Sequence, residues 1–477
     1  MIFQLPSPSI SGGESRSSRW WQRYAPVVTN DPIDYKLKLL IWSYWLLWFA
    51  EGALRKWIFP AYSAPLVIVR DPVAVLIITC ALIFGRWSID LKTVILYILG
   101  LIAFAVTLAN GVPVLVDLVG LRTLCLHFPI IFIMGRILER EDVERMGNLA
   151  VDLALPMSLI MIVQFMSPAG ALVNAGAGIG AEQIGGVGEG RIRAPGVFSF
   201  ISGAAQYYSL AAAYVCARFS QRRYKANFLV GLSLLGIVLA MSVAVSRSLA
   251  GGVMVVSIVF VVASLFIRIS ASRLALLMLA TGVIGIIFVK SSVTAEGFQA
   301  LKDRAFAAND SEGSIVTRFL SGFLIDSDTI EKAGLTGKGL GVGTNMGSQL
   351  LTGGVDFLLA EGEWPRVVLE MGAVLGITFI IWRIVVFGQL AASSLRAIGR
   401  KDILPALLLA AGGLSLLNGQ SGQPATLGYI ILANGLALAA AKSHRAFVLQ
   451  KGLLYRVPRK GANRRHVLSS DSKPTTG

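Results

Sequence analysis

The stretch FLVGLSLLGIVLAMSVAVSRSLAGGVMVVSIVFVVASLFI, from Phe228 to Ile267, decides the fold. It contains two apolar runs, Phe228 to Val245 and Leu249 to Ile267, and each is long enough for a helix that crosses a lipid bilayer. Only Ser246-Arg247-Ser248 separates the runs. The chain must therefore turn back tightly at one face of the membrane, with Arg247 held at the mouth of two helices.

Similar apolar runs recur along the whole chain. The 477 residues are 55% hydrophobic and 15% charged, with a mean hydropathy of +0.69, whereas about a quarter of the residues in a soluble protein are charged. The composition predicts an all-α polytopic membrane protein with about 12 transmembrane helices. The ten other runs are Leu39 to Ala50, Pro65 to Phe84, Val94 to Leu108, Val112 to Met134, Leu149 to Met166, Val197 to Phe219, Leu274 to Val289, Val367 to Val386, Ile403 to Leu417 and Ala425 to Ala441.

Basic residues near the ends of membrane helices stay in the cytoplasm, and their distribution predicts the orientation. Most of the 43 Lys and Arg residues fall on one side if both termini are cytoplasmic. The predicted parts are a cytoplasmic tail at residues 1–38, transmembrane helices 1 to 9 at 39–289, a large outer loop at 290–364, transmembrane helices 10 to 12 at 365–441, and a basic cytoplasmic tail at 442–477.

The net charge of +16 does not indicate a nucleic-acid partner. The tail from Lys442 to Gly477 holds nine of the basic residues against one Asp, whereas the outer loop is acidic overall. A surface that binds a polyanion needs a basic patch, which the loop lacks. We expect the tail to contact anionic lipid.

Ionisable residues are costly in a membrane, so their positions indicate where function lies. Nearly all are expected near the outer leaflet. They are Glu51, Arg55, Lys56, Arg70, Asp71, Arg122, Arg191, Arg193, Arg247, Arg318, Glu361, Glu363, Arg366 and Glu370.

Several of these residues also have purely structural interpretations. Asp71 precedes Pro72, a pattern typical of a helix start with Asp as the cap. Asp117 is expected to neutralise Arg122 or Arg70. Glu363, Arg366 and Glu370 are three and four residues apart, which predicts ion pairs on one helix face, and Arg191 and Arg193 are open to interpretation as solvated loop charges.

The residue inventory restricts the possible chemistry. A guanidinium presents a fixed fork of donors that suits phosphate oxygens, and several arginines at the outer face favour an anionic lipid with a pyrophosphate. The three histidines are His127, His444 and His466, and none is in the outer loop. Carboxylates must then carry any proton transfer there, and Glu361 and Glu363 are the candidates. We predict no metal and no cofactor.

A glycine-rich segment from Gly339 to Asn345 also lies in the predicted outer loop. It matches neither the GxGxxG nor the Walker pattern, and it faces away from cytoplasmic nucleotides. It is interpreted either as a turn whose backbone amides approach a ligand or as a plain turn.

These motifs, in this order, resemble the bacterial O-antigen ligase and polymerase superfamily, whose members move glycans from undecaprenyl diphosphate. The resemblance spans nearly the whole chain and includes a late outer loop. The motifs that carry it are Ser246-Arg247, a loop arginine like Arg318, the GxG segment Gly341 to Asn345, and Glu370-Met371-Gly372. The stretch Glu51 to Trp57, with Arg70-Asp71-Pro72, is similar to an exopolysaccharide-type branch.

One position departs from the pattern of the family. Ligases usually carry His about nine residues before the Glu-x-Gly, where this chain has Glu361, which favours a polymerase-like member. The resemblance implies a metal-independent glycosyltransferase at the periplasmic face of the bacterial inner membrane that polymerises or ligates lipid-linked oligosaccharide. It implies catalytic roles for Arg247, Arg318, Glu361 and Glu363, and substrate binding by Arg193, Arg191, Arg366, Arg122, Arg70 and Asn345.

The implied partners are an undecaprenyl-diphosphate-linked glycan, membrane lipids and other polysaccharide assembly proteins, with no nucleic acid. Two other functional classes stay open. In a transporter or flippase, Arg70, Asp71, Asp117 and Arg122 would line a path. In a non-catalytic assembly subunit, none of the outer charges would matter individually.

Overall fold

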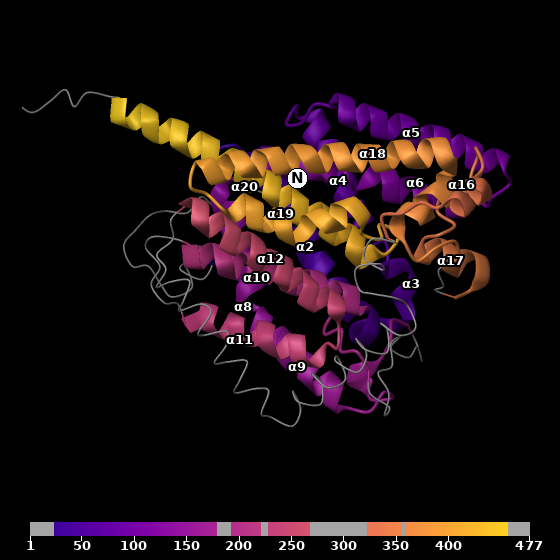
Figure 1. Cartoon of the computed structure of the whole chain (residues 1–477), viewed down its shortest axis with the longest axis horizontal. Helices are drawn as coiled ribbons and strands as arrows, with labels where there is room; N and C mark the ends of the chain where they lie inside the picture. Colours follow the sequence, from indigo (N-terminus) through magenta and orange to yellow (C-terminus); the bar gives the residue numbers. More distant parts are fainter. Residues whose placement is uncertain (1–22, 179–191, 221–227, 268–321, 355–357, 457–477) are drawn as a thin grey trace, which may run out of the picture.

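The computed structural model describes residues 23–178, 192–220, 228–267, 322–354 and 358–456, with side chains described up to residue 442. The secondary-structure elements in these ranges are all helices, which confirms the predicted all-α class (Figure 1). Seven helical segments there are long and apolar enough to cross a membrane, and α11 and α19 are shorter apolar helices. The seven are Pro60–Ile83, Leu91–Ala109, Val114–Ile137, Arg140–Met166, Arg247–Ile267, Glu363–Gly399 and Pro424–Lys442.

The first part of the chain forms helices that are often broken inside one apolar run. A π-helical turn, Arg122–Leu126, interrupts the run that starts at Val114. A new helix then begins at Pro129, because proline has no N–H for the backbone hydrogen bonds of a continuing helix but fits the first position of a new one. The elements are α2 (Pro32–Ala53), η1 (Leu54–Ile58), η2 (Pro60–Tyr62), α3 (Ser63–Leu66), α4 (Asp71–Ile83), α5 (Leu91–Ala109), α6 (Val114–Leu121), η3 (Arg122–Leu126), α7 (Pro129–Ile137), α8 (Arg140–Asp152), α9 (Ala154–Met166) and η4 (Leu172–Asn174).

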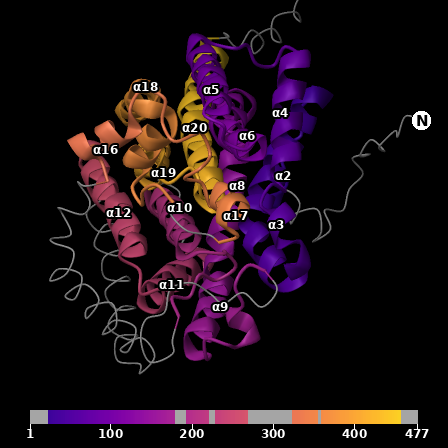
Figure 2. The ribbon, with the colours of Figure 1, turned by 90° about the vertical axis from the view of Figure 1, so that its right-hand side faces the viewer.

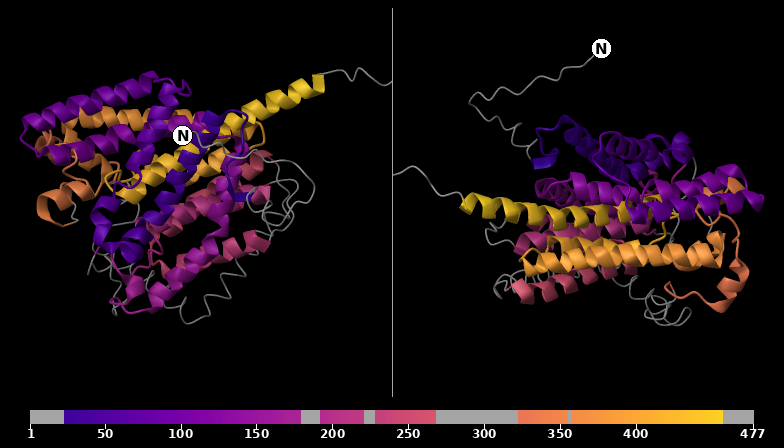
Figure 3. Two further views of the ribbon diagram at one scale, coloured as in Figure 1. Left: turned by 180° about the vertical axis from the view of Figure 1, so that it is seen from behind. Right: turned by 90° about the horizontal axis from the view of Figure 1, so that it is seen from above.

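The second part contains the longest helices. Figure 3 shows α18 and α20 running along the bundle, with α20 continuing beyond its end. The elements are α10 (Ile201–Ser220), α11 (Phe228–Val243), α12 (Arg247–Ile267), α16 (Ser327–Ala333), α17 (Asn345–Thr352), α18 (Glu363–Gly399), α19 (Leu404–Asn418) and α20 (Pro424–Arg456).

Eleven of the twelve predicted runs coincide with these helices. The run Leu274 to Val289 lies outside the described residues, so the count of twelve stays a prediction. Helices α16 and α17 fall within the predicted outer loop at 290–364 and lie at the same end of the bundle, where α16 packs against α18 and α17 packs against α6 (Figure 1).

Ion pairs hold the opposite end of the bundle, where α2 and α8 begin. The ammonium of Lys38 is buried and lies 2.8 Å from Glu139 and 2.7 Å from Asp142. Arg140 binds Asp402 at 2.6 Å, which joins the start of α8 to the start of α19. Figure 2 shows the helices packed side by side along their lengths between the two ends.

Helix α18 is broken near its start at Gly372, whose φ of 81° is rarely adopted by other residues. The break frees backbone groups of α18, and the preceding loop binds them. Lys338 N donates to Leu369 O at 2.7 Å, and Ala373 N donates to Gly334 O at 2.9 Å. The break therefore fixes the loop that leads into the glycine-rich turn.

Candidate functional site

Two arginines from distant helices meet at the loop between α19 and α20. Arg70, just before α4, donates to the carbonyl of Pro424. Arg366, in the first turn of α18, donates to Ser421 Oγ at 3.1 Å. Both guanidinium groups are buried, and their helices are far apart in sequence. We call residues 419–424, which join α19 to the first residue of α20, the 419–424 loop. Hydrogen bonds from the two arginines hold it in place.

A buried cluster of charges surrounds Arg366. Its guanidinium lies 2.9 Å from Glu363 and 2.7 Å from Glu370. Glu363 also accepts from Ser421 Oγ at 2.6 Å and pairs with Arg383. The predicted ion pairs on one face of this helix are confirmed, and all oxygens of Glu363 are engaged.

Arg383 is a member of the cluster that the sequence analysis did not select. It lies inside the apolar run Val367 to Val386, and a charge in such a run is the signal that points to it. Its guanidinium donates to Leu416 O at 2.6 Å and to Gly419 O at 3.0 Å. It therefore satisfies carbonyls at the C-terminal end of α19, where a cation is favourable.

The two candidate carboxylates differ in environment. Glu363 is buried within the ion-pair cluster, whereas the Glu361 side chain is exposed. The backbone carbonyl of Glu361 accepts a hydrogen bond from the Gln420 amide. Of the two, Glu361 is the one placed to meet a molecule from outside the protein.

The glycine-rich turn packs directly against this cluster. Gly343 N donates to Glu370 at 2.8 Å, and Asn345 N donates to Gly422 O at 3.3 Å. Thr344 caps α17, since its hydroxyl accepts from Gly347 N at 3.0 Å. The turn is therefore part of the folded site, and Asn345 lies at the start of α17.

The turn predicts a sharp difference between two glycine variants. Gly341 and Gly353 both have positive φ, so alanine at either position costs about 1–3 kcal/mol of strain. At Gly341 the new Cβ would also lie 2.2 Å from Val116 O, whereas nothing lies within 4 Å at Gly353. We expect Gly341→Ala to lower the thermal unfolding midpoint in detergent clearly more than Gly353→Ala. Equal midpoints would contradict this packing of the turn on α6.

A chain of buried polar side chains runs through the first helices. Glu51 lies 3.2 Å from Arg70, and Arg70 lies 3.4 Å from the hydroxyl of Tyr44. The Tyr44 hydroxyl is 3.0 Å from Nδ1 of His127, whose Nε2 is 3.2 Å from Asp71. These contacts form a continuous hydrogen-bonded relay across α2, α4 and the π-helical region.

Two expectations about this region are wrong. Asp71 does not cap α4, because the helix already begins at Asp71 and its carboxylate turns instead to Arg122 and His127. Asp117 neutralises neither Arg122 nor Arg70, and both its oxygens are buried without a partner among the described residues. Packing between helices selected Asp71 and Glu51 as the partners instead.

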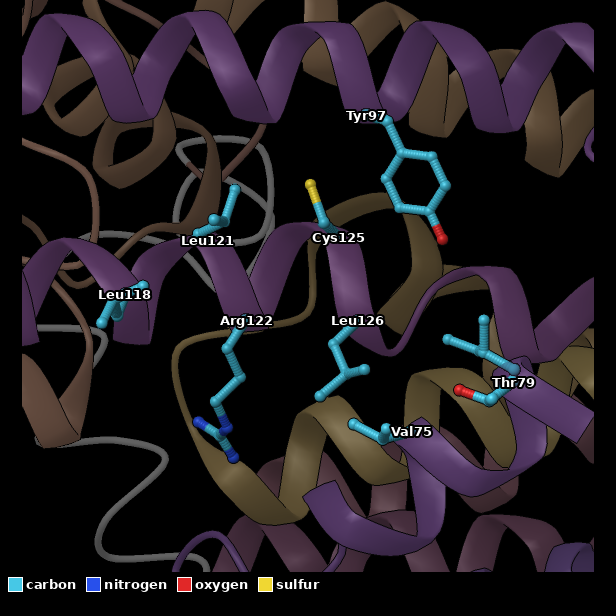
Figure 4. A pocket seen from close by; sticks show the side chains of 9 residues that line it. Val75, Thr79, Tyr97, Leu118, Leu121, Arg122, Cys125 and Leu126 are labelled. Carbon is cyan, nitrogen blue, oxygen red and sulfur yellow. The ribbon is translucent and has the colours of Figure 1, made fainter.

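Arg122 also lines a cavity of about 370 Å³ between α4, α5 and α6 (Figure 4). The other lining side chains are largely apolar, and two of them, Val75 and Leu118, are exposed at the protein surface. The cavity therefore opens on the apolar surface of the helix bundle, with Arg122 as its charged lining residue.

Arg247 is the first residue of α12 and lies two residues after a strained residue, Val245. Val245 has a φ of 44°, which is rare for a β-branched residue, and its side chain is buried. The hydroxyls of Ser246 and Ser248 lie 2.9 Å apart across Arg247. Helix α10 starts near the 419–424 loop. Helix α11 follows α10 and runs back toward that loop, so the end of α11 and Arg247, which comes just after it, lie at the same end of the bundle.

Lys56 and Arg193 lie where η1 meets the segment before α10. The Lys56 ammonium donates to Gly196 O at 2.6 Å and to Phe198 O at 2.9 Å, and burial lowers its pKa to about 7. Nε of Arg193 is buried without an acceptor among the described residues. Arg191 and Arg318 lie outside the described residues.

Neutral polar side chains form a further group that the sequence analysis missed. Ser202 Oγ lies 3.2 Å from Gln423 Oε1, and Gln206 Nε2 donates to Thr426 Oγ1 at 3.1 Å. Oε1 of Gln206 is buried without a described partner. The start of α10 thus presents amide and hydroxyl groups to the start of α20.

No protein-family model matches the chain, and no curated protein and no solved structure matches it. The resemblance to the O-antigen ligase and polymerase superfamily accordingly stays a prediction from the motifs.

Proposed function

We propose that this protein is a membrane glycosyltransferase that polymerises or ligates lipid-diphosphate-linked oligosaccharide at the outer face of the bacterial inner membrane. The observation that carries the proposal is the strained turn before α12. Val245, at a φ of 44°, stores backbone strain two residues before Arg247. Such strain costs about 1–3 kcal/mol and persists where the position of a nearby group matters.

The roles follow from the surroundings of each residue. Arg247 and Arg318 would bind the diphosphate and stabilise it as the leaving group, helped by Arg193, whose Nε has no acceptor among the described residues. Arg366 is enclosed by two carboxylates and would hold the 419–424 loop in place. This favours a positioning role for Arg366.

Glu361 is the better candidate for the group that orients or deprotonates the acceptor hydroxyl. It is exposed beside the 419–424 loop, whereas Glu363 is buried between Arg366 and Arg383. The amides and hydroxyls of Gln206, Gln423 and Thr426 near the same loop supply neutral hydrogen-bonding groups of the kind that a sugar requires.

Transport is the second candidate, and the buried relay favours it. Chains of ionisable side chains inside membrane proteins often mark ion or substrate paths. Here the relay runs from Glu51 through His127 to Arg122, and Asp117 is a further buried carboxylate. A transporter would use these groups and would leave the donor chemically unchanged.

A reconstituted assay distinguishes these functions. Purified protein in vesicles is incubated with undecaprenyl-diphosphate oligosaccharide, and lipid-linked products are resolved by size. Longer lipid-linked chains indicate a polymerase, and consumption of the donor only with an added lipid acceptor indicates a ligase. A donor that crosses the vesicle membrane without being consumed would refute glycosyl transfer and support transport.

A further inference from the structure

A second cavity, of about 360 Å³, lies at the end of the bundle opposite the 419–424 loop. Helix α5 shows the separation, because Asn110 at one of its ends contacts Gly337 beside the candidate site, while Asp90 at its other end lines the cavity. Parts of α5, α7, α18 and α20 form the walls. The cavity is therefore distinct from the proposed transfer site.

Three cations line this cavity with one carboxylate. Lys92 pairs with Asp90 at 2.9 Å, so these two charges balance. Arg136 and Lys442 also line it, and neither makes a hydrogen bond or ion pair with another residue that the structure describes. With three cations and one carboxylate, the described lining thus carries a net charge of +2.

The remaining lining is amphipathic. Phe132, Leu390 and Leu438 line the cavity with apolar side chains, while Gln389 and Ser393 add neutral hydrogen-bonding groups. Lys92 Nζ lies 4.9 Å from the centre of the Phe132 ring, so charge and apolar surface are directly adjacent. A ligand that fits this lining has an anionic head and an apolar part.

We propose that this cavity binds the phosphate headgroup of an anionic phospholipid, held by Arg136 and Lys442. Guanidinium and ammonium groups are strong donors to phosphate oxygens, and basic pockets between membrane helices suit such headgroups. The cavity lies at the ends of membrane-crossing helices, where headgroups are found. The apolar lining side chains then contact the first carbons of the lipid chains. The site is independent of glycosyl transfer.

The test is lipid titration of the delipidated full-length protein in neutral detergent, followed by native mass spectrometry. Phosphatidylglycerol is expected to bind at least ten times more tightly than phosphatidylcholine with the same chains. The double variant Arg136→Gln/Lys442→Gln should lose this preference, and Arg400→Gln/Lys401→Gln should keep it. The control pair is exposed beyond the end of α18 and does not line the cavity.

Two further measurements make the assignment falsifiable. Ser393→Phe fills the cavity without changing charge and should also weaken phosphatidylglycerol binding. Glycerol phosphate should compete poorly, because it lacks the apolar chains. Unchanged lipid preference in the double variant would overturn the site, and competition by glycerol phosphate at concentrations equal to the lipid would assign it to a soluble phosphate compound instead.

Discussion

Replacement of Arg247 by alanine is expected to lower donor consumption in the reconstituted assay by roughly 100-fold to 1,000-fold. Removal of one preorganised donor to a developing negative charge typically costs this much. Arg247 is the first residue of α12 and follows the buried residues Val245 and Ser246, so its backbone is expected to keep its position in the variant. Arg247→Lys should retain only part of the rate, because an ammonium lacks the planar fork of donors.

The matched control for this prediction is Lys332→Ala. Lys332 is an exposed cation on α16, in the predicted outer loop, and pairs with Asp328 at 2.6 Å. It should leave donor consumption unchanged. Normal polymer from both Arg247→Ala and Arg318→Ala, with the protein present in the membrane, would defeat the assignment of these arginines.

The second large effect is expected on stability. Glu363→Ala removes the carboxylate between Arg366 and Arg383. Arg366 keeps its pair with Glu370, but Arg383 loses its ion-paired carboxylate, so one positive charge stays buried without compensation. Breaking a buried ion pair in this way costs about 3–5 kcal/mol. The thermal unfolding midpoint in detergent should fall strongly. The double variant Glu363→Ala/Arg383→Met should recover part of the loss, because one of the buried charges is removed as well.

Glu361→Ala is the control for Glu363→Ala. Its side chain is exposed, so its removal should leave the unfolding midpoint close to that of the wild type. The proposal also expects Glu361→Ala to impair transfer to the acceptor. A Glu363→Ala protein as stable as the wild type would show that the cluster is not a structural ion-pair network.

Local sequence pattern accounted for the helices and for contacts within one helix. Apolar runs such as Leu249 to Ile267 predict helices because a membrane span needs its backbone hydrogen bonds satisfied internally. The pairs between Arg366 and its neighbours Glu363 and Glu370 were predictable since residues three and four apart share a helix face.

The local sequence pattern did not predict the contacts between helices. Asp71 was expected to act locally, yet it pairs with Arg122, and Asp117 was expected to find an arginine, yet it finds none among the described residues. The partner of a charge in a membrane helix depends on the rotation and depth of the neighbouring helix. Sequence spacing within one helix does not specify these quantities.

The sequence alone predicted the all-α class, the apolar helices and the positions of most helices that the structure describes. Packing chose which charges lie together. Arg383 joins Glu363 across twenty residues, and Arg70 reaches Pro424 from a remote helix. The reason is physical: helix formation is governed by neighbours along the chain, whereas a buried ion pair forms wherever tertiary packing brings opposite charges together out of water.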